Sequence, residues 1–484
     1  MAQAETPFRV IVVGGGVAGL AASHALQKAG IDHVVLERRS SVAPPEGASI
    51  AMYPNGARIL HQFGALEAVQ KHCVPPGRYW ARLPNKKIIS NNGVFRIIEQ
   101  NHGSGLLLIE RRQFLQELYD TLPNNSYIRT DAGVRDIKMT PGGVEVELNN
   151  GDVEKGDLVL GCDGVYSRVR TIMWDYANKM TPGLIPVEEK LAIKADWKSL
   201  IVMTTAIPEL GAKDLTIVHN DNYSHMFTMT PKFGYFFVFF RLSEPCTWPH
   251  RPRYTDQDAE DLAAKIASHP VSDTMVFGEV WKHRIRANVV NLEEGVLDHW
   301  YHGRIALAGD SAHKVTPNMA FGGNSGIESV AVFTNHLRRL LAESKGAKPS
   351  AAKLEAALAD YQQERRARML EICNFSGEVT RAQAWASPWY KFLARWVIPM
   401  LPASAFGNQL GAIISAAPKL DFVDVGQFPA GRMPWKDSVA PHRHTGDNKS
   451  GVGLGISGYG YLSAFAACAL VLYMSRLLPL AINT

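Results

Sequence analysis

The sequence predicts an α/β fold in which a domain built on βαβ units is interrupted by an inserted β-sheet and followed by helices. Three observations support this fold class. A glycine-rich turn separates an apolar, β-branched run from an alanine-rich run within residues 8–39. A strand-rich block begins near residue 191, and YFFVFF at 235–240 is its clearest part. A second buried strand, GRIALAGD at 303–310, then precedes long helical segments.

The composition allows a full hydrophobic core and excludes several function classes. Of the 484 residues, 46% are hydrophobic, which suits about two domains. The net charge of +5 is small and the basic residues are scattered, so nucleic-acid binding is not expected. The five cysteines form no CxxC pair and the histidines lack metal-ligand spacing, so neither a metal site nor a disulfide framework is predicted. Residues 1–7 are short and polar, and no cleavable signal peptide is expected.

The glycine-rich turn has the spacing of a dinucleotide-binding loop. Gly14, Gly16 and Gly19 satisfy G-x-G-x-x-G inside a strand–turn–helix unit expected over 9–29. Gly14 permits the tight turn, Gly16 lets the backbone approach a pyrophosphate, and Gly19 lets the helix pack on the strand. The pyrophosphate would meet unpaired N–H groups at the positive end of the helix.

Glu37, at the end of a second strand expected over 34–37, determines which dinucleotide fits. A carboxylate there accepts hydrogen bonds from a ribose 2′-OH and repels a 2′-phosphate, so FAD or NAD is favoured over NADP. Arg38 and Arg39 directly follow this acid and are expected to point outward. The first motif does not separate FAD from NAD.

A later strand end favours FAD. LAGDSAH places Asp310 at the carboxyl end of a strand, where it is positioned to hold a ribityl hydroxyl. Pro317 and the Gly322-Gly323 pair then lead into a helix expected from about Gly323. Its N–H groups suit the electron-rich N1–C2=O edge of a reduced flavin. A simple NAD dehydrogenase has no need of this second cofactor-contacting strand end.

The chain between these motifs has its own local signals. Apolar runs at 144–148 and 158–160 flank the NNGD turn at 149–152, which predicts a hairpin between them. LVLGCDGVYSRVR predicts a buried strand, a Gly-Cys-Asp-Gly turn and the start of a basic helix. Long helices are expected over 354–384.

Taken together, these motifs resemble those of the FAD-dependent monooxygenases of the aromatic-hydroxylase class, also called group A. The dinucleotide fingerprint at 14–37, the Asp-Gly motif at 161–170 and the Gly-Asp motif at 307–313 occur in the family's order and spacing. Within this class the chain is most similar to the membrane-associated fungal epoxidases of paxilline-type indole-diterpene and meroterpenoid pathways. The resemblance covers 8–368. Two further matching segments are PPEGASIAMYPNGARIL at 44–60 and IERRQFLQELY at 109–119.

The resemblance implies a role for residues near the start of the chain. Glu37 is expected to bind the adenosine ribose, and Ala51 to lie against FAD through its backbone. Arg111 is expected to reach the pyrophosphate–ribityl region. Arg111 is preferred to Arg112 because the family places its basic residue directly after an acid, here Glu110.

The resemblance also implies roles in the two later motifs. Asp310 is expected to contact the ribityl chain and Gly323 the flavin. Asp163 and Arg168 would support the region where FAD and NADPH cross, although Asp163 is equally well interpreted as a turn-capping residue.

Two positions depart from the family pattern. Cys162 stands where a small alanine is usual, and the similar volume is expected to cost little. Asn324 occupies the third position of GGNSG, where many relatives have Gln or Ser. The backbone role of this segment survives such a change, and a side-chain role for Asn324 is not expected.

The activity implied by the resemblance is monooxygenation that consumes NADPH and dioxygen, with FAD tightly bound and NADPH binding transiently. The preferred substrate is the prenyl chain of a terpenoid or meroterpenoid intermediate, which would be epoxidised. Hydroxylation of an aromatic polyketide is the alternative within the same chemistry. Alternatives of other classes are an FAD-dependent prenyl reductase or dehydrogenase and a non-catalytic FAD-binding membrane protein. Protein partners are not predicted.

The inserted sheet is expected to hold the substrate. Tyr223 is the predicted catalytic residue, since a phenol at a strand start is able to donate a hydrogen bond and the family uses a tyrosine in this region. Tyr235 is a close rival, packing is an equally good interpretation, and Lys194 ranks lower. The block at 215–242 would supply a dry pocket, although such residues more often form plain sheet core. The candidate pocket residues are Met226, Phe227, Met229 and Phe236.

The C-terminal region predicts a membrane anchor. Residues 450–475 contain no charged side chain, and a helix of that length crosses the roughly 30 Å hydrocarbon layer. A buried C-terminal helix is the alternative. The segment at 389–407 mixes aromatics with Lys391 and Arg395, as an interfacial segment does. We therefore expect a single-pass protein of the endoplasmic reticulum with its catalytic domain facing the cytosol.

The expected domain organisation follows from these segments. The FAD-binding domain has a first part at 1–190 and a second part, with helices, at 291–385. The inserted β-sheet substrate domain occupies 191–290, an interfacial linker 386–450, and a transmembrane helix 451–481.

Overall fold

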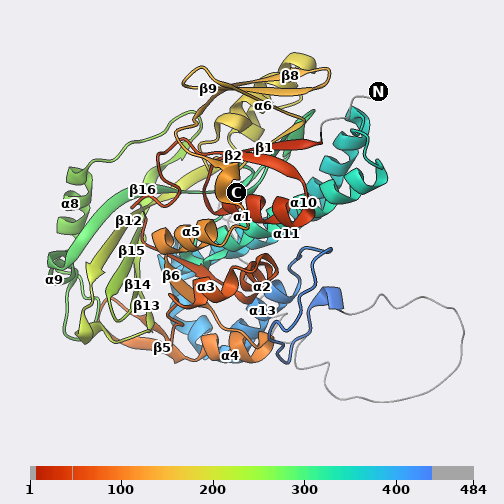
Figure 1. The fold of residues 1–484 in the computed structure, drawn as a ribbon. Coiled ribbons are helices and arrows are strands. Elements are labelled where there is room, and N and C mark those ends of the chain that lie inside the picture. The colour runs from red at the N-terminus through yellow and green to blue at the C-terminus, as the bar shows by residue number, and fades with distance from the viewer. Residues whose placement is uncertain (1–6, 46, 439–484) are drawn as a thin grey trace, which may run out of the picture.

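A parallel sheet forms the centre of the half of the molecule that the sequence predicts to bind FAD, called below the FAD-binding half (Figure 1). The computed structural model describes residues 7–45 and 47–438. The order of the strands is β17-β18-β11-β1-β2-β7, and every neighbouring pair is parallel except β17 with β18. The strands are β1 (Arg9–Val13), β2 (Asp32–Leu36), β7 (Ile128–Arg129), β11 (Leu158–Gly161), β17 (Tyr301–His302) and β18 (Ile305–Leu307).

The opening βαβ unit forms as the sequence predicts. The β-branched run of β1 is almost fully buried, and α1 (Val17–Ala29) follows the glycine turn. The helix ends at Gly30, whose left-handed φ of 68° favours glycine. Leucine and alanine side chains cover the buried side of α1, which therefore packs closely on the sheet.

A second, eight-stranded sheet stands beside the parallel one, at the left of Figure 1. Its order is β19-β16-β12-β15-β14-β13-β4-β5. Four of these strands lie wholly or partly outside the predicted insertion at 191–290, so the sheet is assembled from distant parts of the chain. The domain boundaries themselves stay a prediction. The strands are β4 (Tyr79–Arg82), β5 (Ile88–Asn92), β12 (Lys194–Thr205), β13 (Leu215–Asn220), β14 (Tyr223–Met229), β15 (Phe233–Thr247), β16 (Arg284–Val296) and β19 (His313–Lys314).

Both faces of the eight-stranded sheet are covered. We call the face packed against α8 (Asp256–Lys265) and α9 (Phe277–Lys282) the outer face. The opposite, inner face packs against Ala48, just before β3 (Ser49–Met52), and against Ala384, at the end of α11 (Ala351–Gln383). The inner face is thus the one turned toward the FAD-binding half.

The predicted hairpin is wrong in one of its two strands. β9 (Gly143–Leu148) does turn at the NNGD segment, but it pairs with β10 (Val153–Gly156) and, on its other side, with β8 (Val134–Thr140). The run at 158–160 belongs to β11 of the parallel sheet. All four residues of β11 are buried, as expected for a central parallel strand rather than for a hairpin strand with one exposed face.

Long helices pack the second part of the FAD-binding half, as expected. α10 (Phe321–Glu343) begins two residues before the predicted start, and α11 is a single helix of 33 residues. The remaining elements used below are α2 (Pro54–Phe63), α4 (Val94–His102), β6 (Leu107–Glu110), α5 (Arg111–Asp120), α6 (Arg168–Met180), α12 (Pro388–Phe392) and α13 (Ala403–Ser415).

The predicted transmembrane helix at 451–481 lies outside the described residues. Within residues 7–45 and 47–438, no single helix has both the length and the apolar composition to cross a bilayer. The segments Pro388–Met400 and Ala403–Ser415 meet those criteria only as a pair, and they are bent by 103° relative to each other. In the second segment, Leu410, Ile413 and Ile414 are buried in the protein core.

Candidate functional site

Three distant motifs meet at one edge of the parallel sheet. Val13 of β1 is in register with Gly161 of β11, and Gly161 is in register with Leu307 of β18. Backbone hydrogen bonds continue the alignment beyond the strands, from Cys162 N to Val13 O at 2.8 Å and from Ala308 N to Gly161 O at 2.9 Å. The glycine turn, the Asp-Gly motif and the Gly-Asp motif therefore share the carboxyl edge of the sheet, where α/β folds bind ligands.

The glycine turn requires glycine at two of its positions. Gly14 has φ of +103°, and a Cβ there would lie 2.6 Å from the carbonyl oxygen of Cys162. A Cβ on Gly19 would lie 1.7 Å from the carbonyl oxygen of Gly14. These close approaches explain the first and third glycines of the motif in terms of backbone packing.

Gly16 differs from the other two because the space around it is open. A Cβ on this residue would meet no atom within 4 Å. Gly16 is also the N-cap of α1, it has no side-chain cap, and the first turn of the helix carries no acid. Unpaired N–H donors therefore face an open cradle, and this arrangement fits a diphosphate.

Glu37 lies directly after β2, where the sequence predicts the ribose-binding acid. Its side chain is 6% exposed, and Oε2 accepts a hydrogen bond from Gly15 N at 2.7 Å. Oε1 accepts one from Arg39 N at 2.9 Å. Each oxygen keeps a further lone pair for a ribose hydroxyl. The expectation that Arg39 points outward is wrong in part, because its guanidinium lies 3.8 Å from Oε1.

Asp310 follows β18 in a short 3-10 turn and pairs with a lysine that the sequence interpretation missed. The ammonium of Lys314, four residues further along the chain, donates to the Asp310 carboxylate. Burial opposes the charged form of Lys314, but the Asp310 carboxylate outweighs it and raises the pKa of the ammonium. The spacing of four residues between Asp310 and Lys314 in GDSAHK is the sequence signal from which this pair could have been predicted.

Arg111 is the first residue of α5 and donates its backbone N–H to Ala48 O at 3.0 Å. It is partly buried and lies near enough to Lys314 to lower the pKa of that ammonium, whereas Arg112 is exposed. The structure therefore brings Arg111, Lys314 and Asp310 into one charged group at the edge of the site. A cationic and hydroxyl-binding group of this kind fits the pyrophosphate–ribityl part of FAD.

The side chain of Asn324 has a structural role, and the contrary expectation is wrong. Its Nδ2 donates to Ala51 O at 3.0 Å and to Ala320 O at 2.8 Å, while its Oδ1 accepts from Tyr53 N at 3.0 Å. These bonds fix β3 against the first turn of α10. Gly323 permits the same approach, since a Cβ there would lie 2.7 Å from Cδ1 of Ile50.

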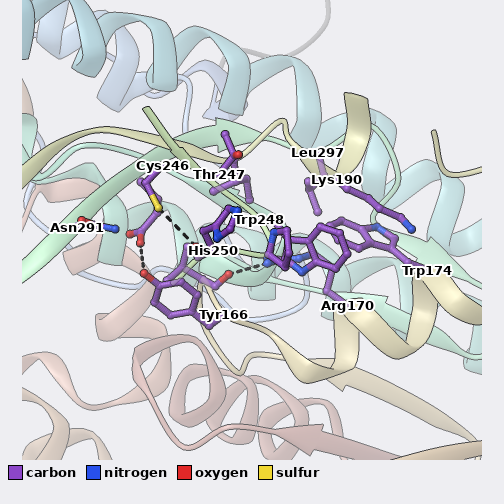
Figure 2. Close-up of a pocket in the computed structure, with 14 residues that line it drawn as sticks. Tyr166, Arg170, Trp174, Lys190, Cys246, Thr247, Trp248, His250, Asn291 and Leu297 are labelled. Atoms are coloured by element: carbon purple, nitrogen blue, oxygen red, sulfur yellow. Dashed lines mark hydrogen bonds between the residues drawn. The ribbon is translucent and has the colours of Figure 1, made fainter. Parts of the chain in front are cut away.

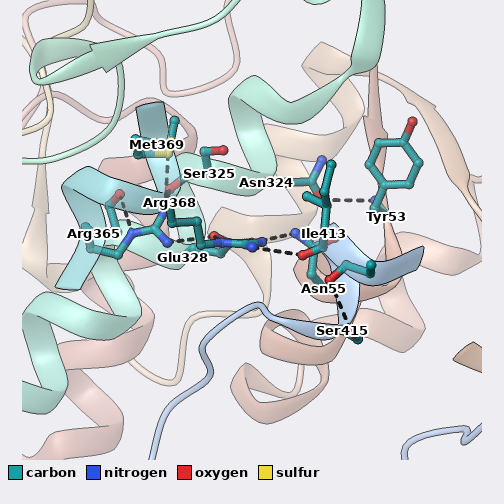
Figure 3. A network of polar contacts seen from close by, with 12 residues as sticks. Tyr53, Asn55, Asn324, Ser325, Glu328, Arg365, Arg368, Met369, Ile413 and Ser415 are labelled. Atoms are coloured by element: carbon teal, nitrogen blue, oxygen red, sulfur yellow. Dashed lines mark hydrogen bonds and ion pairs between the residues drawn. The ribbon is translucent and has the colours of Figure 1, made fainter. Parts of the chain in front are cut away.

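A buried ionic network continues from this helix turn (Figure 3). The Glu328 carboxylate accepts from Arg365 at 2.8 Å, from two nitrogens of Arg368 at 2.8 Å, and from Asn55 at 2.6 Å. Arg368 also donates to Ile413 O in α13 at 2.8 Å. Burial opposes the Glu328 charge, but the two arginines outweigh it and lower its pKa from 4.5 to about 2. The network ties α10 to α2, α11 and α13.

In the Asp-Gly motif, the structure shows the capping role of Asp163. Its carboxylate accepts hydrogen bonds from Ser167 Oγ at 2.5 Å, Arg168 N at 2.7 Å and Val169 N at 3.1 Å, at the start of α6. Burial raises the pKa of Asp163, against these hydrogen bonds. The Arg168 side chain donates to Arg135 O on β8. The predicted support of an FAD–NADPH crossing stays a prediction.

Arg170, in the same motif, joins two of the three converging segments. It donates to Ser311 O at 3.0 Å and to Val165 O at 2.7 Å. Beside it lies a hollow with aromatic, basic and acidic walls (Figure 2). The lining residues are Val165, Tyr166, Arg170, Trp174, Lys190, Ile193, Cys246, Thr247, Trp248, Pro249, His250, Asn291, Glu293 and Leu297.

The two candidate tyrosines lie on opposite faces of the eight-stranded sheet. Tyr223 is on the outer face, where it stacks on Phe240 at 5.8 Å and forms a hydrogen bond with His269 Nδ1. Tyr235 is on the inner face, clustered with Ala48. The predicted catalytic role of Tyr223 is untested, but its hydroxyl is turned away from the FAD-binding half.

Two charged residues accompany Tyr235. Arg286 of β16 pairs with Glu110, at the end of β6, at 2.9 Å. Burial raises the pKa of Tyr235, the Glu110 carboxylate raises it further, and Arg286 opposes the shift. The phenol therefore stays protonated at neutral pH. Neither Arg286 nor Glu110 was nominated from the sequence.

The other residues proposed for the substrate divide between the two faces. Met226 lies on the inner face, whereas Phe227, Met229 and Phe236 pack on the outer face against α8 and α9, so for these three the sheet-core interpretation is confirmed. Lys194 is exposed at the start of β12 and pairs with Asp196 at 3.3 Å.

Among residues 7–45 and 47–438, no group of three His, Cys, Asp or Glu side chains suits a metal ion.

Comparison with known proteins agrees with the cofactor expected at this edge. The model of the FAD binding domain family matches residues 7–376. The FAD-dependent monooxygenase DEP2 of Fusarium langsethiae is 41% identical over 90% of this chain and 84% of its own. The FAD-dependent monooxygenase ausM of Penicillium brasilianum is 32% identical over 92% of both chains. The FAD-dependent monooxygenase atmM of Aspergillus flavus is 34% identical over 87% of both.

Solved structures share the fold at low sequence identity. HpxO of Klebsiella pneumoniae, in complex with FAD and uric acid, superimposes with a TM-score of 0.70 at 18% identity. The match covers 85% of this chain and 97% of HpxO. PqsL of P. aeruginosa, in complex with 2-aminobenzoylacetate, has a TM-score of 0.60 at 17% identity and covers 78% and 96% of the two chains.

Proposed function

This chain belongs to the FAD binding domain family and is an FAD-dependent monooxygenase of fungal secondary metabolism, and we propose that it epoxidises the prenyl chain of a terpenoid or meroterpenoid intermediate. NADPH is the proposed electron donor and dioxygen the oxygen source. The observation that carries the substrate class is the chemical character of the inner face. That face is the wall of the eight-stranded sheet turned toward the cofactor-binding half.

The inner face is dominated by apolar side chains from five neighbouring strands, β16, β12, β15, β14 and β13. Aromatic rings, aliphatic side chains and a thioether lie side by side on it, a surface that suits a hydrocarbon chain and excludes water. An isoprenoid chain has no polar group along its length and therefore needs no hydrogen bond from such a wall. The main contributors are Trp197, Ile217, Met226, Phe237, Phe239 and Leu292.

When bound, FAD supplies the activation of dioxygen from which one oxygen atom is transferred. The chain's own residues hold the cofactor and keep the reacting atoms dry. The Gly16 cradle and the Arg111, Lys314 and Asp310 group suit the diphosphate and ribityl parts. The first turn of α10, which Asn324 fixes against β3, would offer its N–H groups to the flavin edge.

Tyr235 is the proposed proton-handling residue on the inner face. Its phenol is protonated, and the Glu110–Arg286 pair lies near enough to influence its pKa. A protonated phenol is able to donate a hydrogen bond to an oxygen atom that gains negative charge during transfer. We place this role on Tyr235 rather than Tyr223 because only Tyr235 lies on the face turned to the cofactor half.

A second candidate function is hydroxylation of an aromatic polyketide. The guanidinium of Arg286 lies on the inner face, in register with Met203, and a phenolate is a suitable partner for such a cation. The existing partner, Glu110, competes for the same guanidinium and disfavours this reading. Prenyl epoxidation needs no displacement of that pair.

Paired substrates distinguish the two reactions. Membranes containing the full chain are supplied with NADPH and either a farnesylated aromatic acceptor or the same acceptor without its prenyl chain. We expect a product heavier by one oxygen, bearing an epoxide, from the farnesylated acceptor alone. Ring hydroxylation of the unprenylated acceptor, with the farnesylated one unchanged, would support the second candidate and reject the first.

A further inference from the structure

Four apolar side chains project from the segment that follows α11 and form what we call the 392–400 stripe. Phe392 is 49% exposed, Trp396 62%, Ile398 46% and Met400 84%. They lie at the end of α12 and in the two turns that follow it, a π-helical turn at Leu393–Val397 and a 3-10 turn at Ile398–Met400. Four large apolar side chains left exposed within nine residues are typical of an interaction surface.

The base of the stripe is held firmly by the protein. Leu393 and Ala394 are buried, and Ala394 packs with Trp385 and Leu83 in a small core cluster. The ammonium of Lys391 donates to both carboxylate oxygens of Asp221, at 2.8 and 2.9 Å. The apolar side chains therefore project from a fixed platform on the edge of the eight-stranded sheet.

The neighbours of the stripe indicate a lipid surface as its occupant. The cationic groups of Lys391 and Arg395 lie over the Trp385 ring at 4.8 and 5.7 Å, and Arg395 also lies 5.9 Å from the Trp396 ring. Tryptophan and basic residues beside an apolar stripe are typical of segments that lie in the headgroup region of a bilayer.

The length of the remaining chain agrees with this occupant. The uncharged run at 450–475 has the length and composition of a bilayer-spanning helix. Residues 439–450, fully extended, reach at most roughly 40 Å. A span at 450–475 would therefore hold Ser438, where the described residues end, within that distance of the membrane.

We infer that the 392–400 stripe docks on the headgroup region of a lipid bilayer and places the edge of the eight-stranded sheet against it. One backbone hydrogen bond and one from an arginine side chain connect the two. Asn222 N, beside β14, donates to Ala384 O at 2.8 Å, and Arg241 of β15 donates to Ala386 O at 2.7 Å. Ala384 itself packs on the inner face. Docking would thus bring the inner face next to the phase in which a prenylated substrate dissolves, a consequence that rests on the proposed function.

Photo-crosslinking to lipid tests the docking without any need for activity. The full chain is reconstituted in vesicles of phosphatidylcholine and phosphatidylserine that contain a lipid with a diazirine near its headgroup, and labelled peptides are identified by mass spectrometry. We expect lipid adducts on the peptide containing Trp396. Adducts confined to 451–481, or protection of Trp396 by a second copy or by the chain's own C-terminal segment, would overturn the inference.

A triple variant and a matched control test the consequence for the substrate. In Phe392→Ser/Trp396→Ser/Met400→Ser, we expect adducts on this segment to disappear and the KM for vesicle-borne substrate to rise at least threefold, with kcat unchanged. The control variant is Val153→Ser/Met180→Ser/Ile285→Ser. It replaces three apolar side chains at other places on the surface that are 50%, 71% and 51% exposed, and we expect it to change neither the adduct yield on this segment nor the KM.

The two readouts separate the docking from the proposed function. Loss of adducts with an unchanged KM would uphold the docking and reject the lipid-borne substrate. Equal adduct yields on the segment in the triple variant and in the control would reject the docking itself.

Discussion

The amide of Asn324 links two segments that are 273 residues apart, because its Nδ2 donates to Ala51 O while its Oδ1 accepts from Tyr53 N. The same nitrogen also donates to Ala320 O. A single side chain therefore holds β3 and the start of α10 in the geometry in which both would border the flavin.

Removing this amide is expected to damage stability and cofactor binding together. Asn324→Ala leaves one buried N–H and two buried carbonyls without this partner, which costs about 2–4 kcal/mol of the free energy of unfolding. The displaced helix turn should also raise the dissociation constant for FAD roughly tenfold or more. Urea unfolding and titration of the apoprotein with FAD measure the two effects.

Asn335→Ala is the matched control, on the same helix but remote from the proposed cofactor site. Asn335 Nδ2 donates to Lys419 O at 2.8 Å, and its Oδ1 accepts from Asp421 N at 3.1 Å. We expect a loss of stability of about 1–3 kcal/mol with unchanged FAD affinity. Equal FAD affinities in the two variants would refute the positioning role of Asn324.

The glycine turn separates folding from cofactor binding. Gly16 has φ of −77° and open space around it, so Gly16→Ala should fold normally. The new methyl group would occupy the cradle and weaken FAD binding by a factor of about ten or more. Gly14→Ala should not give folded protein in useful yield, because its Cβ would collide with Cys162 O.

Thermal unfolding and flavin fluorescence give the two measurements. Gly30→Ala provides the control for backbone strain, since Gly30 also has a positive φ, of 68°, and open space around it. A loss of about 1 kcal/mol with normal FAD binding is expected there. Normal FAD affinity in Gly16→Ala would show that the cradle does not hold the diphosphate.

Substitution of Tyr235 and of Tyr223 is expected to have different effects on product yield. Tyr235→Phe removes the phenol on the inner face, so we expect at least tenfold less oxygenated product per NADPH consumed and a changed pH profile of kcat. Tyr223→Phe loses only the hydrogen bond with His269 on the outer face, and should retain its product yield with about 1 kcal/mol less stability.

Product yield per NADPH, measured for both variants, decides between the residues. If Tyr223→Phe is the variant that loses product while Tyr235→Phe retains it, the placement of the proton-handling group on the inner face is wrong. Equal KM values for the substrate in both variants would exclude a difference in binding as the cause.

The Glu328 network predicts how stability depends on pH. The pKa of Glu328 is lowered from 4.5 to about 2 in the folded chain, so its ionised form contributes stability above pH 4.5. That contribution declines as the pH falls from 4.5 toward 2. Glu328→Gln leaves Arg365 buried without its anion and should cost about 3–5 kcal/mol at pH 7.

Urea unfolding between pH 7 and pH 3 measures this dependence. The difference between the original chain and Glu328→Gln should shrink as the pH falls below 4.5. Glu364→Gln is the control, because Glu364 forms a partly exposed pair with His336 and its loss should cost about 1 kcal/mol or less. A difference that is independent of pH would show that the Glu328 charge does not stabilise the fold.

The parallel half of the molecule was predictable because its signals are local. Strand, glycine turn and helix follow one another within 9–29, and the later motifs each follow an apolar strand. Parallel strands bring their carboxyl ends to one edge, so the convergence of Gly14, Asp163 and Asp310 followed from topology. The predicted partner of β9 was wrong because two short strands, β10 and β11, follow the same NNGD turn. The more exposed β10 pairs with β9, whereas the fully buried β11 joins the parallel sheet.

The faces of the substrate sheet were not predictable by the same means. Both faces are buried, so YFFVFF in β15 shows no alternation of apolar and polar residues. A shift of one residue exchanges the faces, and only the register with β12 and β14 places Tyr235 inward and Tyr223 outward. Asn324 was missed for a different reason, since its three partners are backbone groups that carry no sequence signature.

Incubation under heavy dioxygen tests the central claim most directly. The full chain in membranes is supplied with FAD, NADPH, a farnesylated acceptor and ¹⁸O₂, and the product is examined by mass spectrometry. We expect one ¹⁸O atom in each product molecule and one NADPH oxidised for each. A product that has lost or gained two hydrogens without any ¹⁸O would contradict the account and identify a dehydrogenase or a reductase instead.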